Sequence, residues 1–327
     1  MHVSPAIALV TTATRLSGLL TKYGTKGSAR FRMKTARKHL ASKSPEDADL
    51  MVKEADFDFY EKEDDQYRRS VDEVEESLGG LGFSVINLPK QFLATYDFRH
   101  TSLVVVIGPD GLVANTAKYV GDLPIVAINP DPQSIDGKLL PFKVGQARTV
   151  VQRTLDQKTR SAQITLARVD LSDGQSMLAF NDFFIGRRSH TSARYVLYSD
   201  RESEVHSSSG VIVSTGAGAT GWLSSVFNMS AGVTQWIGGE EGAAPSLDWE
   251  DRRLAWIVRE PFVSRTTKAG LVAGMIDEAK TIRIESLMPE HGVIFSDGIE
   301  SDFLEFNSGA IADLSVASQR TRLVVPD

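Results

Sequence analysis

The sequence contains no cysteine among its 327 residues. Disulfide bonds, thiolate nucleophiles and cysteine-ligated zinc or iron–sulfur sites are therefore excluded. The six histidines stand singly along the chain, and the patterns GxxxxGK[ST], HExxH and GxSxG are missing. A P-loop, a metal-ligand cluster and a Ser-His-Asp triad thus have no support.

Long hydrophobic runs are also missing. The longest, such as 102–108 and 210–214, fall far below the roughly 20 residues that a helix needs to cross a bilayer. No Lys or Arg precedes Arg15, and a strand-like run begins at Ala6, which leaves no room for a signal peptide. We therefore expect a cytoplasmic protein that does not bind a membrane. The net charge of −6 argues against nonspecific binding to nucleic acid.

Charged side chains cluster in a segment at about 22–76. The stretch 22–43 carries eight basic residues and no acidic one, whereas 46–65 carries ten acidic and two basic residues. This pattern indicates an insertion, either a pair of solvated helices or an arm whose two blocks attract each other. A basic arm that faces phosphates is the alternative.

The first half of the chain has the pattern of an α/β domain. The β-branched runs 103–107 and 124–128 are apolar throughout, and a further strand is expected at 83–88. Apolar strands separated by helix-length segments indicate a parallel sheet covered on both faces. We expect this domain over residues 1–145.

The second half has a different pattern. The stretches 163–170 and 175–180 flank Ser172-Asp173-Gly174, a hairpin signal. Short strands are predicted at 194–199, 210–214, 254–258, 281–285, 292–296 and 311–316. We therefore expect an all-β, mainly antiparallel domain over residues 146–327, with the option that its last strand returns to the first domain.

The segment Gly108-Pro109-Asp110-Gly111 follows the predicted strand 103–107 directly. Ligands of open parallel sheets bind beyond the carboxyl ends of the strands, so a carboxylate here is well placed to meet one. The glycines would allow backbone N–H groups to approach a phosphate. The alternative is an ordinary Pro-Asp-Gly turn.

A second Gly-rich segment, 214–222, contains a literal GxGxxG after the strand 210–214. A dinucleotide-binding turn requires a βαβ unit, whereas the strands before this segment are linked by hairpins. A Gly-rich bend between strands of a β domain is the competing interpretation.

Asn181-Asp182 lies in the otherwise apolar stretch 180–184, and Asp297-Gly298 follows the strand 292–296. An Asp-Gly pair at such a place is more often a turn than a site. Buried polar groups require partners, so Asn181-Asp182 has either a structural partner or a ligand.

Taken in order, these segments resemble the NAD kinase family, most closely its mitochondrial-type branch. Gly108-Pro109-Asp110-Gly111 stands where the family has GGDG, and 129–137 resembles that branch's N-T-D-P…S-x-G stretch. Asn181-Asp182 matches an Asn-Glu pair, and 215–222 matches T-x-T-G-S-T-A-Y. Arg259-Glu260-Pro261 and Asp297-Gly298 also have counterparts, so the match runs in register over about 83–316.

The resemblance implies a Rossmann-like N-terminal domain, a β-sandwich-like C-terminal domain and a dinucleotide held in the cleft between them. It also implies that a Mg²⁺-bound triphosphate, ATP or another, donates its γ-phosphoryl group to the 2′-hydroxyl of NAD. Asp110 would be the general base, and Gly108 and Gly111 would admit the phosphates. Asn181 and Asp182 would bind ribose hydroxyls and the adenine side. The dinucleotide site would be completed by Thr215, Thr220, Gly221, Trp222, Ser225 and Asp297. Members of the family are homodimers or tetramers.

The sequence departs from the family pattern mainly in the donor loop. Pro109 replaces the second Gly of GGDG and deletes one backbone N–H, and Leu112 stands where Thr is usual. These departures leave two alternatives to an NAD kinase. One is a catalytically silent protein that binds NAD or NADP, and the other is a related kinase with a lipid or sugar acceptor.

Overall fold

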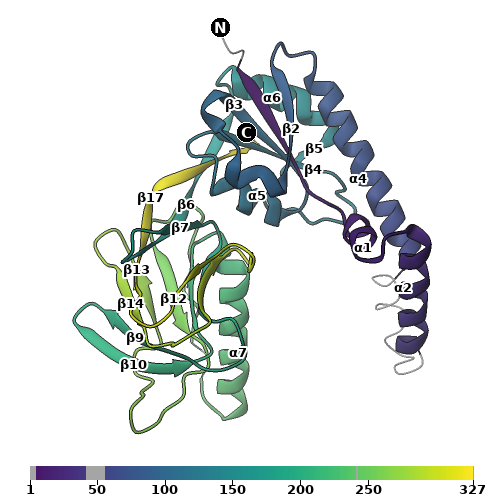
Figure 1. The fold of residues 1–327 in the computed structure, drawn as a ribbon. Helices are drawn as coiled ribbons and strands as arrows, with labels where there is room; N and C mark the ends of the chain where they lie inside the picture. Colours follow the sequence, from purple (N-terminus) through teal and green to yellow (C-terminus); the bar gives the residue numbers. More distant parts are fainter. Residues whose placement is uncertain (1–4, 42–55, 241, 327) are drawn as a thin grey trace. The chain divides into compact units, whose positions relative to one another are not determined.

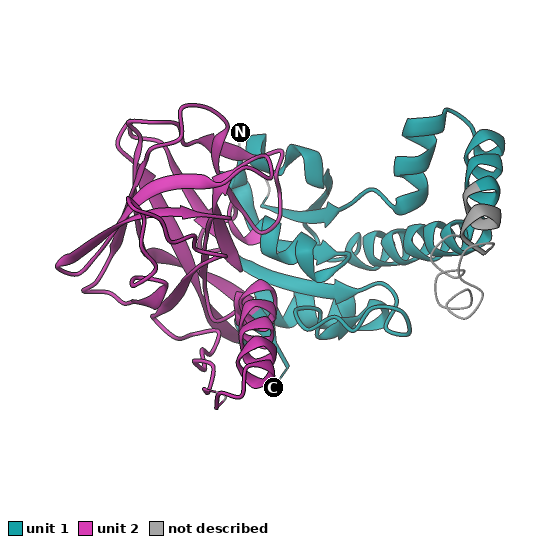
Figure 2. Ribbon diagram, turned by 90° about the horizontal axis from the view of Figure 1, so that it is seen from below, with its two compact units in different colours: residues 1–116, 124–160, 324–327 teal, residues 117–123, 161–323 magenta. Residues whose placement is uncertain are grey.

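A computed structural model describes residues 5–41, 56–240 and 242–326. The chain divides into two compact units (Figure 2). Unit 1 comprises residues 1–116, 124–160 and 324–327, and unit 2 comprises residues 117–123 and 161–323. Residues 42–55 of the charged segment lie outside the described residues.

Unit 1 is built on a parallel sheet in the order β2-β1-β3-β4. Its strands are β1 (Ala6–Thr11), β2 (Ser84–Pro89), β3 (Thr101–Ile107) and β4 (Pro124–Asn129), with the short β5 (Phe142–Lys143) beside β4. The long strand β17 (Ile311–Val325) also pairs with β4, and its last two residues belong to unit 1. The predicted parallel sheet is therefore confirmed.

Both faces of this sheet are covered at its central strands β1, β3 and β4, whose residues are mostly apolar and buried. Ile7, Leu9, Val105 and Ile128 pack with α4 (Phe57–Leu78) and α6 (Ala147–Leu155) on one face. The alternate strand residues, such as Ala8, Val10, Val104, Val106 and Ala127, are fully buried as well. The remaining helical segments of the unit are η1 (Lys90–Thr95), η2 (Phe98–His100), α5 (Asp110–Ala117) and η3 (Val144–Gln146).

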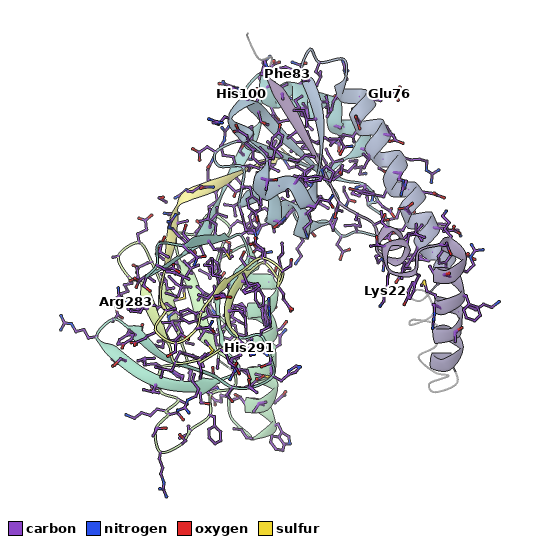
Figure 3. All side chains as sticks on the ribbon, viewed as in Figure 1. Lys22, Glu76, Phe83, His100, Arg283 and His291 are labelled. Carbon is purple, nitrogen blue, oxygen red and sulfur yellow. The ribbon has the colours of Figure 1, made fainter. Side chains whose placement is uncertain are left out.

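The described part of the charged segment is helical. The helices α1 (Arg15–Tyr23) and α2 (Lys26–Ala41) pack with the start of α4 around Leu16, Ala29 and Phe57. Ion pairs join the basic block to the acidic block, with Arg30 contacting both Asp58 and Glu61 and Lys26 contacting Glu61. Lys22 of α1 and Glu76 near the end of α4 are both exposed (Figure 3). The interpretation as solvated helices whose blocks attract each other holds for these residues.

Unit 2 is a sandwich of two sheets. One contains β6 (Arg160–Leu171), β7 (Ser176–Ala179), β9 (Ala193–Ser199), β10 (Glu202–Ser208), β14 (Ile282–Ser286) and most of β17. The other has the order β13-β12-β11-β8-β15-β16. Its strands are β8 (Asp182–Arg187), β11 (Val211–Ser214), β12 (Leu254–Val258), β13 (Ala273–Ile276), β15 (Gly292–Ser296) and β16 (Phe303–Glu305).

The core of unit 2 lies between these sheets. Phe183 and Ile185 of β8 point into it, together with Tyr195, Val213 and Ile294. The pairings within the second sheet are antiparallel, and the hairpin β6–β7 turns at the predicted Ser172-Asp173-Gly174. The mainly antiparallel second half is thus confirmed.

The helix α7 (Trp222–Trp236) follows β11 through the short turn η4 (Gly218–Thr220) and lies beside the second sheet (Figure 1). Its Leu223 packs on Ala255 of β12, on the outer side of that sheet. The interpretation of 214–222 as a bend between two strands is therefore wrong, because the segment connects a strand to a helix.

Candidate functional site

The turn at Gly108 lies at the carboxyl end of β3, and α5 begins at Asp110. A Cβ atom on Gly108 would come within 2.8 Å of Leu112 Cδ2, so glycine is needed here. The Leu112 side chain is 2% exposed. Leu112 therefore contributes to the packing beneath the turn and not to its outer surface.

Asp110 is half-buried and oriented by the neighbouring loop. Its Oδ1 accepts a hydrogen bond of 2.7 Å from the backbone N–H of Leu139. Because β3 and β4 are adjacent and parallel, the loops that follow them meet at the same edge of the sheet. One carboxylate oxygen is thereby fixed, and the other forms no hydrogen bond within the described part of the chain.

The loop that follows β4 is held in shape by Asn129. Its side-chain Nδ2 donates to the carbonyl of Ile135 at 2.9 Å, and its Oδ1 accepts from the N–H of Asp131 at 3.0 Å. Gly137 has a φ of +63°, and a Cβ there would lie 2.6 Å from Asn129 Nδ2. The Asn-Pro-Asp…Gly spacing thus produces a rigid loop that presents Leu139 N–H to Asp110.

Tyr67 of α4 connects two further strand ends. Its hydroxyl accepts from the N–H of Thr12, after β1, and donates to the carbonyl of Ile107, both at 2.9 Å. Burial raises the pKa of the phenol, which keeps the hydroxyl protonated. The sequence pattern did not single out Tyr67, because it lies in a charged helix far from the Gly108 turn in the chain.

In unit 2, Asp297 holds the Asn181-Asp182 segment through the backbone. Its carboxylate accepts from the N–H groups of Phe180, Asn181 and Asp182 at 3.2, 2.6 and 3.4 Å. Asp297 has a φ of +56°, a conformation uncommon for a non-glycine residue, which these bonds support. Its side chain is 2% exposed, so Asp297 holds the backbone of this segment from the interior and is covered from solvent.

Lys118 supplies the opposite charge. Its Nζ donates to Ser296 Oγ at 2.9 Å and lies 3.5 Å from Asp297 Oδ2. Burial raises the pKa of Asp297, and Lys118 and the three N–H groups act in the opposite direction. No sequence pattern singles out Lys118, because its partner Asp297 is distant in the chain.

Asp182 is buried without a partner for its own carboxylate. Burial, and then the charge of Asp297, raise its pKa to about 7. Neither this carboxylate nor the Asn181 amide forms a side-chain hydrogen bond to the residues that the structure describes. Since an unpaired buried polar group is costly, this pair is suited to receive hydroxyl donors from a ligand.

The turn between β11 and α7 is fixed by Thr215. Its hydroxyl donates to the carbonyl of Phe180 and accepts from the N–H groups of Ala217 and Gly218. Cβ atoms on Gly216 and Gly218 would lie 1.9 Å from Asp248 O and 2.2 Å from Asn181 O. These glycines therefore serve close contacts within the chain, and the literal GxGxxG is not a phosphate-binding turn.

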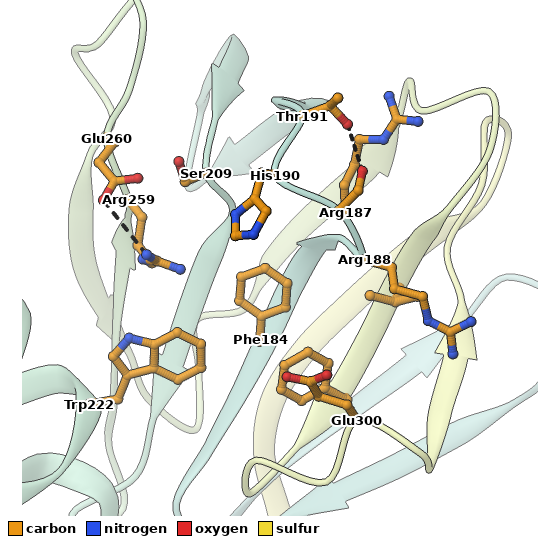
Figure 4. A pocket seen from close by; sticks show the side chains of 13 residues that line it. Phe184, Arg187, Arg188, His190, Thr191, Ser209, Trp222, Arg259, Glu260 and Glu300 are labelled. Carbon is orange, nitrogen blue, oxygen red and sulfur yellow. Dashed lines mark hydrogen bonds and ion pairs between the residues drawn. The ribbon is translucent and has the colours of Figure 1, made fainter. Parts of the chain in front are cut away.

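A pocket of about 310 Å³ opens on the outer face of the second sheet (Figure 4). Its aromatic floor is a row of stacked rings, in which Phe184 lies 5.6 Å from Trp222 and 5.0 Å from Phe295 between ring centroids. The rim carries Arg187, Arg188, His190, Ser209, Arg259, Glu260 and Glu300. Of the residues expected at a dinucleotide site, Trp222 lines this pocket. Thr220, Gly221 and Ser225 are close to Trp222 in the sequence and are exposed.

The described residues contain no group of three or more His, Asp or Glu side chains placed to hold a metal ion. Among the helices described, none is both long and apolar enough to cross a membrane.

Two comparisons, with protein-family models and with curated protein sequences, find no match. Solved structures do match. Yeast NADH kinase complexed with NADH aligns with a TM-score of 0.57 and 15% identity over 100% of this chain and 85% of that chain. An NAD kinase from Archaeoglobus fulgidus in complex with ATP aligns with a TM-score of 0.53 and 19% identity over 77% of this chain and 88% of that chain. The chain therefore has the two-domain fold of the NAD(H) kinases, with a Rossmann-like part and a β-sandwich part, and the predicted fold class is confirmed.

Proposed function

We propose that the protein is a phosphotransferase of the NAD kinase type. It transfers the γ-phosphoryl group of a Mg²⁺-bound nucleoside triphosphate, ATP or another, to the 2′-hydroxyl of the dinucleotide. The observation that carries this proposal is the unpartnered pair Asn181-Asp182, fixed through three backbone bonds to Asp297, in a chain with the fold of NAD(H) kinases. An amide beside a carboxylate suits a ribose, whose hydroxyl groups both donate and accept.

Asp110 is the general base in this proposal. Its fixed Oδ1 orients the carboxylate, and the second oxygen takes the proton of the 2′-hydroxyl. The freed oxygen forms a bond to the γ-phosphorus, and the bond to the bridging oxygen breaks, so that the nucleoside diphosphate leaves with its Mg²⁺. Phosphoryl transfer of this kind depends mostly on positioning and on charge stabilisation.

The donor phosphates are assigned to the turn Gly108–Gly111. Gly111 is exposed, with no atom within 4 Å of a Cβ built on it, so a phosphate can approach the backbone. The N-terminus of α5 adds a favourable field for negative charge. Pro109 contributes no N–H, so the turn has one donor fewer than a GGDG turn.

The dinucleotide is assigned to the outer face of the second sheet. Asn181 and Asp182 bind ribose hydroxyls, and Thr220, Gly221, Trp222 and Ser225 contribute the neighbouring surface. Thr215 and Asp297 act indirectly, because Thr215 is fully buried and the Asp297 carboxylate is used by three N–H groups.

The proposed enzyme is a homo-oligomer that associates through α7. Met229, Val233, Trp236 and Ile237 are 52–85% exposed and recur at helical spacing, and α7 contains no charged residue. A second copy presents the same uncharged apolar surface and is therefore its natural partner.

The deciding experiment incubates the protein with Mg-ATP and either NAD or NADH and measures the 2′-phosphorylated product. Calorimetric titration with NAD, NADP and ATP is run in parallel. Binding of NAD or NADP without turnover would show that the protein is a catalytically silent dinucleotide-binding protein. Phosphorylation of a lipid or a sugar in place of the dinucleotide would show that it is a related kinase with another acceptor.

A further inference from the structure

Lys138 is the only cationic residue in the two stretches 108–117 and 130–141, which follow β3 and β4. The first stretch runs from the end of β3 to the end of α5 and contains no Lys or Arg, and the second contains Lys138 alone. The same stretches carry three carboxylates, those of Asp110, Asp131 and Asp136. A triphosphate assigned to this edge of the sheet therefore meets an acidic surface with a single side chain of opposite charge.

The backbone of Lys138 is held in a tight turn. The N–H of Leu140 donates to the carbonyl of Gly137 at 3.0 Å, which closes the turn around Lys138 and Leu139. The side chains of Leu139 and Leu140 are buried, at 7% and 4% exposed, whereas Lys138 is exposed. The turn is thus anchored by its two leucines, and the lysine side chain is free to meet a ligand.

This turn brings Lys138 close to the carboxylate of Asp110. The Leu139 N–H that donates to Asp110 Oδ1 at 2.7 Å belongs to the peptide unit between Lys138 and Leu139. Lys138 Cα is about 2.4 Å from that nitrogen and hence within about 5 Å of Asp110 Oδ1. An extended lysine side chain spans roughly 6 Å from Cα to Nζ. Its ammonium group is therefore within reach of a phosphoryl group that reacts beside Asp110.

The ammonium group of Lys138 is not committed to another carboxylate. Lys138 forms neither an ion pair nor a side-chain hydrogen bond with the residues that the structure describes. By contrast Arg15, the first cation after β1, is paired with Glu63 at 2.8 Å. A cation that stands unpaired among carboxylates is available for an anionic ligand.

We propose that Lys138 is a catalytic residue of the phosphoryl transfer, and that its ammonium group contacts the non-bridging oxygens of the γ-phosphoryl group. The inference rests on the proposed function, in which Asp110 takes the proton of the 2′-hydroxyl. Negative charge spreads over these oxygens in the transition state, and a positioned cation stabilises it. Lys138 stays protonated throughout, so the bonds made and broken are those of the transfer alone. Its charge also offsets the N–H that Pro109 lacks.

The test compares Lys138→Met and Lys138→Arg with the wild type. Steady-state kinetics give kcat and KM, and calorimetry gives the dissociation constants of Mg-ATP and Mg-ADP. We expect Lys138→Met to lower kcat about 10²-fold, with KM for the dinucleotide unchanged. Lys138→Arg keeps the charge and should retain more than about a tenth of kcat. In Lys138→Met the dissociation constant of Mg-ATP should rise several-fold, whereas that of Mg-ADP, which has no γ-phosphoryl group, should stay unchanged.

Lys90→Met is the matched control. Lys90 is exposed and follows β2 at the same edge of the sheet, but β1 lies between β2 and β3. Two strand spacings, roughly 10 Å, therefore separate its strand from the one that leads to Asp110. We expect kcat and both dissociation constants to match the wild type in this variant.

An unchanged kcat in Lys138→Met, or an equal loss of kcat in Lys90→Met, would overturn the inference and leave the proposed function standing. Equal weakening of Mg-ATP and Mg-ADP would also overturn it, because the lysine would then act on the shared phosphates or on the shape of the loop. If the wild type phosphorylates no dinucleotide, the proposed function itself is wrong. In that case, Mg-ATP affinity that weakens in Lys138→Met without a change for Mg-ADP would still support the contact with the γ-phosphoryl group.

Discussion

The ammonium group of Lys118 lies 3.5 Å from a carboxylate oxygen of Asp297, and these side chains are only 5% and 2% exposed. The pair lies directly behind Asn181 and Asp182, because the Asp297 carboxylate also accepts their backbone N–H groups. The backbone of Asn181-Asp182 is thus held by the buried carboxylate of Asp297. The negative charge of Asp297 is in turn compensated by the buried ammonium group of Lys118.

The substitution Lys118→Met should leave Asp297 as an uncompensated buried charge. We expect a loss of about 3–5 kcal/mol in the free energy of unfolding, measured by urea denaturation at neutral pH. Loss of the cation should also raise the pKa of Asp182 further above its usual range, since Asp182 already experiences the charge of Asp297.

Asp297→Asn is the informative counterpart. Its amide oxygen can still accept from the Asn181 N–H, but the negative charge beside Asp182 is gone. The two variants should therefore shift the pH midpoint of dinucleotide binding in opposite directions, upward for Lys118→Met and downward for Asp297→Asn. Shifts of the same sign would mean that both changes merely loosen the segment.

Asp182 should give the protein a characteristic dependence of stability on pH. Its pKa is about 7 in the folded protein against about 3.9 when unfolded. A raised pKa in the folded state contributes stability that is complete below the unfolded pKa and is lost as the pH rises through the folded pKa. We expect this contribution, about 2–4 kcal/mol, to disappear between pH 4 and pH 7.

Asp182→Asn tests that contribution. The variant should lack this decline in the free energy of unfolding and be more stable than the wild type at pH 8, while its dissociation constant for the dinucleotide rises. An identical pH profile in wild type and variant would contradict the assignment of Asp182 as the titrating group.

Much of the fold could be predicted from periodicity alone. The strand 254–258 appears in the structure with the expected bounds, and the predicted strand 103–107 lies within β3 (Thr101–Ile107). The turn at Asp173-Gly174 closes the predicted hairpin. Helix α7 was missed because its sequence is uncharged and follows a Gly-rich turn, so neither a charged face nor an N-cap side chain marks it.

The candidate site was predictable only in part. Asp110 and Asn181-Asp182 could be singled out because their sequence neighbours, a Gly-flanked turn and an apolar stretch, mark them as unusual. Lys118 and Tyr67 have partners that are distant in the sequence. The residues of the aromatic pocket come together on a sheet face that exists only after the strands pair. A single sequence holds no record of such contacts, so these residues became visible only in three dimensions.

Asp110→Asn should abolish turnover while leaving the fold intact. The asparagine oxygen can accept from Leu139 N–H as the carboxylate does, so we expect less than about 1 kcal/mol of destabilisation. Loss of the general base should lower kcat by roughly 10²–10⁴-fold. Asp122→Asn, at an exposed position outside the site, is the control. Undiminished product formation by Asp110→Asn would rule out the assigned mechanism.

Pro109→Gly should improve use of the triphosphate. The change restores a backbone N–H in an exposed turn that is assigned to the donor phosphates, so KM for the triphosphate should fall several-fold. Stability should decrease by about 0.4–1 kcal/mol, because glycine increases the freedom of the unfolded chain. A lower stability with unchanged donor KM would show that the missing N–H does not face the phosphates.

Trp236→Lys should dissociate the proposed oligomer. Trp236 is 85% exposed near the end of α7, where a cation is compatible with the helix dipole, so the fold itself should tolerate the change within about 0.5 kcal/mol. Burying a lysine against the apolar face of a second α7 is unfavourable, which should move the species seen by sedimentation velocity towards the monomer. Phe31→Lys is the matched control, since Phe31 is 68% exposed on α2, a helix of unit 1. An oligomer that survives Trp236→Lys unchanged would assign the interface to another surface.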